Sequence, residues 1–153
     1  MDAKIARIFT TYGPRMKLRD GLLIPDFILN ALDGRDLVIY GDGDINQSLC
    51  YVSDMVDGLV RLMATGPEIA IVNLGLDEPY KMSEVAEKII QMTNSSSQIV
   101  YEAPLIFLTK KGLPDLRRAK ESLDWIPLVR LEDGLRRTIE YTLANKENLS
   151  FKN

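Results

Sequence analysis

Two short apolar segments constrain the fold more than any other feature of the sequence. Residues 5–9, IARIF, are apolar except for Arg7 and run into a Tyr-Gly-Pro turn sequence at 12–14. Residues 69–75, IAIVNLG, form a second nearly continuous apolar run. Runs of this kind are typical of strands that are buried on both faces and flanked by parallel neighbours. We therefore expect an α/β protein whose two strands belong to a parallel sheet larger than this chain supplies.

The composition is that of one soluble globular domain, because 46% of the 153 residues are hydrophobic and 27% are charged. The formal charge of -3 argues against nucleic acid or an anionic membrane as the main partner, since those surfaces attract clustered lysine and arginine. No apolar run approaches the roughly 20 residues that cross a bilayer, and the first residues lack the pattern of a secretory signal. We therefore expect no nucleic-acid or membrane partner and a cytoplasmic location.

The chain contains no histidine and a single cysteine. Histidine is the commonest general base and metal ligand, so these counts argue against a transition-metal site. Cys50 lies in the apolar stretch LCYV and has no second cysteine with which to form an internal disulfide. We expect a buried, unreactive thiol rather than a nucleophile.

Apolar periodicity and turn residues predict short helices and strands that alternate along the chain. Helices are expected within residues 22–34, 53–63, 83–92, 115–123 and 131–143, and further strands within 36–43, 48–54 and 98–104. The expected N-cap residues are Ser53 or Asp54, Ser83 and Asp115, because their side-chain oxygens can accept the free N–H groups of a first helical turn. We expect Arg7 to form an ion pair within the fold rather than to act in catalysis.

Five segments in a fixed order carry a resemblance to a known family. They are ARIFTTYGPRM, IPDFILNALDGRDLVIYGDG, YVSDMVDGLVRLM, VNLG and PDLRRAKESLDWIPLVRLEDGL. This set resembles the C-terminal half of the NAD-dependent epimerase/dehydratase family, the extended short-chain dehydrogenases. Within the family it is most similar to UDP-glucuronate decarboxylases and dTDP-glucose 4,6-dehydratases, and the similarity covers the chain from Ile5 to about Leu143.

The resemblance implies a fold for each part of the chain. Residues 1–153 would form a single C-terminal substrate-binding domain of a Rossmann-type extended short-chain dehydrogenase. Its two late sheet strands would lie at about 5–11 and 69–75, beside a small mixed α/β substrate-binding lobe. Trp125 resembles the packing tryptophan of the family, which implies a place in the core.

Two motifs of the complete family enzymes are missing from these residues. A dinucleotide cradle needs a Gly-rich turn between a strand and a helix, whereas Gly41 and Gly43 lie in a turn between two strands. The Tyr-x-x-x-Lys catalytic pair is also missing, because the nearest match, Tyr141 to Asn145, ends in the wrong residue. We therefore expect no catalytic residue and no bound NAD in this chain alone. The N-terminal NAD-binding half would be absent, whereas the complete family enzyme uses NAD.

By resemblance, the base of a nucleotide-sugar would occupy an apolar slot with a few backbone partners. Its residues would be Leu23, Ile24, Phe27, Val38 and Tyr40. Periodicity alone supports a plainer interpretation, in which the same side chains belong to the ordinary core.

The family's anchors for the substrate depart from the usual pattern at three positions. Family members carry Asn where Thr10 stands, Gln-x-Arg where residues 45–47 stand, and Arg where Gly112 stands. At the second position Gln47 brings no charge, so a charge-assisted contact of roughly 1.5–3 kcal/mol becomes a neutral one of about 1 kcal/mol. Substrate binding in this chain has therefore either changed or weakened.

A neighbouring loop can replace part of the lost charge. Lys110 or Lys111 lies in the same loop as Gly112 and can supply a point charge without the fork geometry of arginine. Thr10, Gln47 and Lys111 therefore complete the expected substrate-binding set.

Three functional hypotheses follow from these residues. In the first, the chain is the nucleotide-sugar-binding portion of an NAD-dependent sugar-nucleotide epimerase, dehydratase or decarboxylase. The complete enzyme would be similar to UDP-glucuronate decarboxylase, which is a lyase. The chain alone would not be catalytically complete. It would bind a UDP- or dTDP-sugar and would pair with an N-terminal half or a second copy. The second is a non-catalytic binding or assembly module that completes a partner chain through its exposed sheet edge. The third is a remnant without a ligand.

Overall fold

The computed structural model describes residues 3–41, 43, 46–104 and 112–149. In chain order its elements are β1 (Ile5–Ile8), β2 (Thr11–Tyr12), α1 (Leu23–Leu32), β3 (Leu37–Tyr40), β4 (Asn46–Gln47), β5 (Cys50–Tyr51), α2 (Val52–Met63), β6 (Ile71–Leu74), β7 (Tyr80–Lys81), α3 (Met82–Thr93), β8 (Ile99–Glu102), α4 (Arg117–Leu123) and α5 (Leu131–Leu149).

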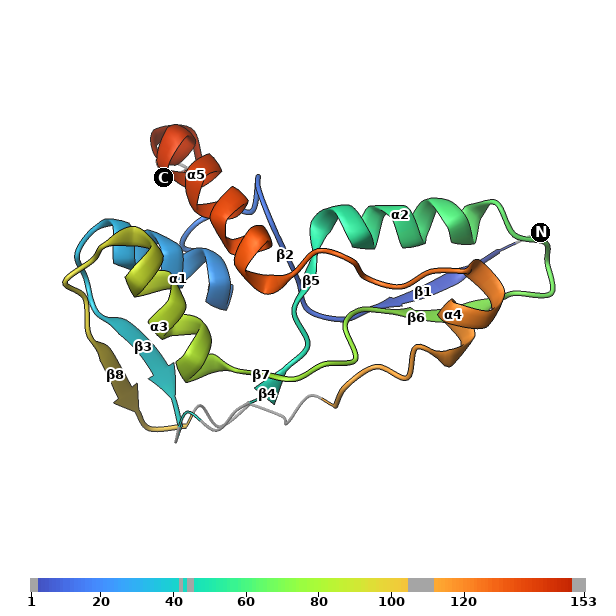
Figure 1. The fold of residues 1–153 in the computed structure, drawn as a ribbon, viewed down its shortest axis with the longest axis horizontal. Coiled ribbons are helices and arrows are strands. Elements are labelled where there is room, and N and C mark those ends of the chain that lie inside the picture. Colours follow the sequence, from blue (N-terminus) through green and yellow to red (C-terminus); the bar gives the residue numbers. More distant parts are fainter. Residues whose placement is uncertain (1–2, 42, 44–45, 105–111, 150–153) are drawn as a thin grey trace.

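The elements form two lobes at opposite ends of an elongated molecule (Figure 1). The three-helix lobe contains α1, α3 and α5 with strands β3 and β8, and the two-helix lobe contains α2 and α4 with strands β1 and β6. The two-residue strands β2, β5, β4 and β7 lie between them. Each lobe has its own cluster of buried apolar side chains.

Parallel pairing is present in both lobes. β1 pairs in parallel with β6, with Ile5 opposite Ile71, and β3 pairs in parallel with β8, with Leu37 opposite Ile99. Between the lobes, β2 pairs in parallel with β5, and β4 pairs antiparallel with β7. Within the described residues each sheet has two strands. The two expected apolar strands are therefore confirmed as a parallel pair, although the first segment divides into β1 and β2.

The core of the three-helix lobe follows from the alternation of β3 and the periodicity of its helices. Leu37 and Ile39 of β3 are almost fully buried, and they face the buried side chains of α1, α3 and α5. The α1 helix has Pro25 in its first turn and ends just before Gly34, whose φ of +66° is a conformation that glycine adopts readily. The expected helix at this position is confirmed.

The core of the two-helix lobe is smaller and is organised around Trp125. This side chain is 1% exposed and packs with Met55 of α2, Leu74 of β6 and Leu123 of α4, which confirms its expected core position. Cys50 lies in the same cluster, and burial raises the pKa of its thiol to about 12. The expected burial of this thiol is confirmed, and a thiol with that pKa stays protonated at neutral pH.

The expected N-cap residues of α2, α3 and α4 are wrong. The N-cap residues are Tyr51 for α2 and Lys81 for α3, and neither helix start has a side-chain capping hydrogen bond. The reason is that β5 runs directly into α2 and β7 directly into α3, so the last strand residue takes the N-cap position. Asp54 and Ser83 fall inside the first turn. Asp115 lies just outside the N-cap of α4, although its carboxylate does accept the N–H of Arg117 at 3.0 Å.

Candidate functional site

The expected apolar slot begins with three residues at the start of α1. Ile24 and Phe27 are each 2% exposed and belong to the core of the three-helix lobe, and Leu23 packs against that core while partly exposed. For Ile24 and Phe27 the plainer interpretation, ordinary core, therefore agrees with the structure. Their side chains can shape the position of Leu23, but they offer little surface to a ligand.

The other two slot residues lie on β3 but face away from that core. Successive strand residues point to opposite faces, and Leu37 and Ile39 occupy the core face. Val38 and Tyr40 are half-buried on the other face. The structure therefore does not bring Phe27 together with Val38 and Tyr40 on a single face of β3.

Two of the expected anchors, Thr10 and Gln47, lie in the segments between the lobes. Thr10 follows β1, and its carbonyl oxygen accepts the N–H of Cys50 at 2.9 Å. Gln47 is half-buried on β4, where it stands opposite Tyr80 of β7. Gly112 is exposed. Ile45, Lys110 and Lys111 lie outside the described residues.

Tyr80 is a polar neighbour of Gln47 that the sequence did not single out. Burial raises the pKa of its hydroxyl, with smaller contributions from the carboxylates of Glu78 and Glu132. The hydroxyl therefore stays protonated at neutral pH and can donate a hydrogen bond. No residue pattern indicated this role, because the pairing of β4 with β7 joins segments that are far apart in the sequence.

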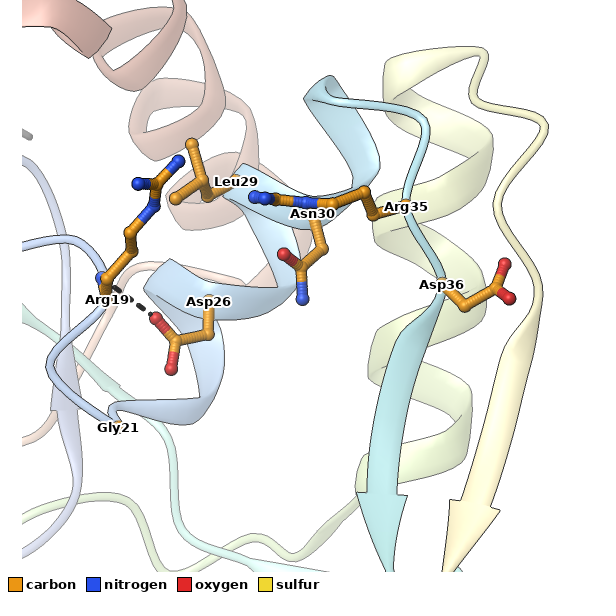
Figure 2. A pocket seen from close by; sticks show the side chains of 7 residues that line it. All are labelled: Arg19, Gly21, Asp26, Leu29, Asn30, Arg35 and Asp36. Carbon is orange, nitrogen blue, oxygen red and sulfur yellow. Dashed lines mark hydrogen bonds between the residues drawn. The ribbon is translucent and has the colours of Figure 1, made fainter.

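A cavity of about 380 Å³ lies on the outer side of α1. Its lining residues are Arg19, Gly21, Asp26, Leu29, Asn30, Arg35 and Asp36. Figure 2 shows the side chains of Arg19 and Arg35 on either side of Leu29, with the Asp36 carboxylate pointing away from both. None of the expected substrate residues lines this cavity.

Hydrogen bonds from the backbone occupy both acidic side chains of this cavity. The Asp26 carboxylate accepts the N–H of Arg19 at 3.1 Å, which helps hold Arg19 at a φ of +60°, unusual for a residue with a side chain (Figure 2). Burial raises the pKa of Asp26, and that hydrogen bond opposes the effect. Asp36 accepts the N–H of Gln98 at 3.0 Å. The guanidinium of Arg19 and the amide of Asn30 are donors of the kind that suits phosphate or carboxylate groups.

A charged cluster joins this region to the end of α5. Arg35 donates to one carboxylate oxygen of Asp33 at 2.7 Å, and Lys146 donates to the other. The hydrogen bond from Lys146 lowers the pKa of Asp33, and the charge of Arg35 adds to the effect. Asp33 follows α1, so the cluster connects α1 to α5.

A second cavity, of about 480 Å³, lies beside the β1–β6 pair. It is lined by Arg7, Ile71, Asn73, Asp115, Arg117, Arg118, Glu121 and Ser122. Arg117 donates to the Asp115 carboxylate at 2.6 Å, and this contact lowers the pKa of Asp115 to about 2. Arg7 is exposed and makes no hydrogen bond or ion pair with the residues that the structure describes, so the expected ion pair within the fold is wrong. Its side chain lines this cavity together with residues of α4.

The buried carboxylate of Asp54 joins α2 to the segment before α5. It accepts the N–H groups of Leu128 at 3.0 Å and Val129 at 2.8 Å, and the indole of Trp125 donates to the Asp54 carbonyl at 2.9 Å. Asp54 therefore has a structural role, although a different one from the expected cap. A cap from sequence is a local inference, whereas these bonds span more than 70 residues.

Among the residues that the structure describes, no three histidine, cysteine, aspartate or glutamate side chains come together in a way that could hold a metal ion. None of the described helices combines the length and the apolar composition that a membrane span requires.

Most of the chain is similar in sequence to known proteins. The NAD dependent epimerase/dehydratase family matches residues 1–75. UDP-glucuronic acid decarboxylase 1 of Xenopus tropicalis is 40% identical over 141 residues, which are 92% of this chain and 33% of the relative. UDP-glucuronic acid decarboxylase 3 of Arabidopsis thaliana is 42% identical over 135 residues, which are 88% of this chain and 39% of the relative. The chain thus spans between a third and two fifths of the length of these relatives.

Solved structures confirm the Rossmann-type α/β fold of this family. An epimerase from Methanothermobacter thermautotrophicus has a TM-score of 0.89 at 28% identity and covers 94% of this chain, which spans 44% of that structure. UDP-glucose 4-epimerase of Thermotoga maritima, solved with UDP-glucose, has a TM-score of 0.86 at 28% identity, with coverages of 94% and 46%. UDP-glucuronic acid 4-epimerase of Bacillus cereus, solved with UDP-glucuronic acid and NAD, has a TM-score of 0.84 at 26% identity, with coverages of 92% and 45%.

Proposed function

We propose that this chain, whose residues 1–75 match the NAD dependent epimerase/dehydratase family, is the nucleotide-sugar-binding portion of an enzyme similar to UDP-glucuronic acid decarboxylase. The observation that carries the proposal is the 40–42% identity to such decarboxylases over about nine tenths of the chain. The Bacillus cereus neighbour, solved with UDP-glucuronic acid, supports the same ligand class. We propose that the protein acts in the cytoplasm.

The described residues do not fit the NAD of the complete family enzymes. A pyrophosphate cradle needs a Gly-rich turn that leads from a parallel strand into a helix. Gly41 and Gly43 have φ values of +93° and +78°, but they follow β3 and precede β4, and a side chain at Gly43 would meet the ring of Tyr101. We therefore propose that this chain contributes contacts to the nucleotide-sugar and that residues outside it hold NAD and the catalytic pair.

The proposed ligand contacts combine exposed parts of the expected site residues. Leu23, Val38 and Tyr40 are only partly buried, so they keep surface for an apolar base or a sugar. Ile24 and Phe27 support Leu23 from the core. Thr10, Gln47 and Lys111 are the proposed polar contacts, with a UDP-sugar favoured over a dTDP-sugar because of the decarboxylase relatives.

A second candidate function is an assembly module that completes a partner chain without binding a sugar. The observation that favours it is the edge of β1 that no other described strand pairs with, because an unpaired strand edge recruits other strands. A titration with the sugar separates the two functions, since the assembly module alone would bind none.

Calorimetric titration of the chain with UDP-glucuronic acid, dTDP-glucose and NAD tests the proposal. We expect binding of the UDP-sugar and none of NAD. Gln47→Arg should tighten the UDP-sugar by about 1–2 kcal/mol, the difference between a neutral and a charge-assisted hydrogen bond, and added salt should reduce the gain. Gln91→Arg, on the exposed side of α3, is the matched control and should have no effect. Micromolar NAD binding, or no UDP-sugar binding, would contradict the proposal.

A further inference from the structure

We propose that the cavity of about 380 Å³ on the outer side of α1 is a binding site for a phosphate group, which Arg19 and Arg35 hold from two sides. The inference goes beyond the proposed function, because none of the expected substrate residues lines this cavity. The phosphate group belongs to inorganic phosphate or to the phosphate monoester of a small metabolite.

The first argument is that two segments bring guanidinium groups to the same cavity. Arg19 lies in the loop before α1, and Arg35 lies in the segment that follows the helix. Figure 2 shows their side chains on either side of Leu29. The side-chain amide of Asn30, which also lines the cavity, adds further N–H donors. Donors of this kind suit the oxygens of a phosphate group.

The second argument is that contacts within the fold position both arginines. The backbone of Arg19 has a φ of +60°, and the Asp26 carboxylate stabilises this unusual conformation by accepting its N–H at 3.1 Å. The side chain of Arg35 donates to the Asp33 carboxylate at 2.7 Å. Lys146 of α5 donates to the other oxygen of Asp33 and helps to fix it. Groups that are positioned in advance lose less conformational freedom when they bind a ligand.

The third argument is an excess of positive charge around Asp33. The hydrogen bond from Lys146 lowers the pKa of Asp33, burial opposes this effect, and the charges of Lys146, Arg35 and Arg19 lower the pKa further. One carboxylate therefore interacts with three cations. The guanidinium of Arg19 makes no hydrogen bond or ion pair with the part of the chain that the structure describes. An anion between Arg19 and Arg35 would offset the repulsion among these cations.

The two carboxylates that line the cavity do not take the place of this anion. Asp26 accepts hydrogen bonds from the backbones of Arg19 and Gly21. Asp36 accepts the N–H of Gln98 at 3.0 Å, and its carboxylate points away from both guanidinium groups (Figure 2). Backbone groups therefore occupy both carboxylates, and the guanidinium of Arg19 stays available to a ligand.

The donors and the charge favour phosphate over a carboxylate. A carboxylate has two oxygens, which a single guanidinium fork can occupy, whereas a phosphate has enough oxygens for donors on two sides. A phosphate monoester carries a charge of about −1.5 to −2 at neutral pH, which offsets the two cations in excess around Asp33. The cavity of about 380 Å³ also has room for a small organic group beside the phosphate.

Calorimetric titration of the chain with inorganic phosphate and with glycerol 3-phosphate tests the proposal. At least one of them should bind with a dissociation constant below about 1 mM, and Arg19→Gln and Arg35→Gln should each weaken that binding about tenfold or more, the loss expected for a charge-assisted hydrogen bond. Lys17→Gln removes the same charge from the loop of Arg19, at an exposed ion pair with Asp20, and is the matched control. No binding by the unmodified chain, or an equal loss in Lys17→Gln and Arg19→Gln, would overturn the proposal.

The comparison of the two ligands identifies the source of the phosphate group. Tighter binding of glycerol 3-phosphate would support a phosphorylated metabolite as the ligand, because the organic group then adds contacts within the cavity. Equal affinities would support inorganic phosphate.

Nuclear magnetic resonance locates the ligand in the unmodified chain. The side-chain Nε–H signals of Arg19 and Arg35 should shift during the titration with the phosphate compound. The signal of Arg117, which is held by an exposed ion pair in the two-helix lobe, should stay unchanged. Equal shifts of all three signals would overturn the proposal, because they would indicate general attraction of anions to surface arginines.

Competition separates this site from the proposed nucleotide-sugar site. Saturating UDP-glucuronic acid should leave phosphate binding unchanged, and Arg19→Gln should leave the titration with UDP-glucuronic acid unchanged. Displacement of the phosphate compound by the UDP-sugar would overturn the inference of a separate site. If no UDP-sugar binds while phosphate binding depends on Arg19, the proposed function fails and the phosphate site stands.

Discussion

Strands β3 and β1, one from each lobe, are buried to very different degrees. α1 and α3 cover one face of β3, and Leu37 and Ile39 are almost inaccessible. β1 is apolar except for Arg7, yet Ile5 and Ile8 remain more than half exposed. Full burial of one such side chain is worth about 1.5–3 kcal/mol, so this exposure forgoes a substantial part of the stability of a small domain.

This difference separates a strand that lies under helices from an outer strand, and each lobe contains one of each kind. β6 is as buried as β3, with Val72 and Leu74 almost inaccessible, and β8 is as exposed as β1. The stability of the two-helix lobe should therefore depend on β6 and on the contacts around Trp125 and Asp54.

The largest effect should come from Trp125→Ala, which breaks the two-helix lobe at its centre. The substitution removes a fully buried ring and its hydrogen bond to the Asp54 carbonyl, and it should lower the free energy of unfolding by about 3–5 kcal/mol. Urea unfolding measures the loss. Ile126→Ala, next in sequence but half exposed, is the control, and a similar loss there would show that Trp125 has no special role.

Asp54→Ala should have the next largest effect, because it cuts the bond between α2 and the segment that leads to α5. Two N–H groups, those of Leu128 and Val129, would lose a charged acceptor, at a cost of about 1.5–3 kcal/mol. Asp57→Ala, at an exposed ion pair of the same helix, should cost less than about 1 kcal/mol by the same urea measurement. Equal losses would refute the connecting role of Asp54.

Gly134→Ala tests the packing of the three-helix lobe. Alanine usually stabilises a helix relative to glycine by up to about 1 kcal/mol, but a Cβ at this position would overlap the hydroxyl of Tyr12, which donates to the Leu131 carbonyl. We expect a net loss of about 1–2 kcal/mol from overpacking. Adding Tyr12→Phe should recover part of it in a double-mutant cycle, and a stabilising Gly134→Ala would show that this lobe is loosely packed.

The smallest effect should come from Asp33→Asn, at the surface of the three-helix lobe. Because Lys146 lowers the pKa of Asp33 in the folded chain, its stabilising contribution is present above the unfolded value near ~3.9 and is lost as the pH falls through the folded value. At pH 7 the free energy of unfolding of the variant should be lower than that of the unmodified chain by less than about 1 kcal/mol. This difference should shrink between pH 4 and pH 2, as Asp33 of the unmodified chain becomes protonated. An Asp33→Asn variant with the acid dependence of the unmodified chain would exclude this linkage, and Asp133→Asn is the exposed control.

Much of the fold could be predicted from the sequence, because it depends on local periodicity. The apolar runs identified β1 and β6, and the helical stripes identified α1, α2, α3 and α5. The paired strands β4 and β7 were missed, since two residues are too short for any periodicity. The N-caps of α2 and α3 were misplaced because a strand that runs straight into a helix leaves no separate capping residue.

Less of the candidate site could be predicted, because its contacts join distant segments. The loop at Arg19 is held by Asp26, and Asp54 bonds residues more than 70 positions away. The exposure of Arg7 could not be predicted either, since exposure depends on what packs against a strand and not on the strand itself. The assignments of Thr10 and Gln47 stay predictions.

Residue-resolved amide hydrogen exchange of β1 and β3 tests the central contrast most directly. The amides of Ala6 and Ile8 should exchange much faster than that of Phe9, which donates to β6, and much faster than that of Ile39 in β3. If Ala6 and Ile8 exchange as slowly as Phe9 and Ile39, β1 is not an exposed outer strand.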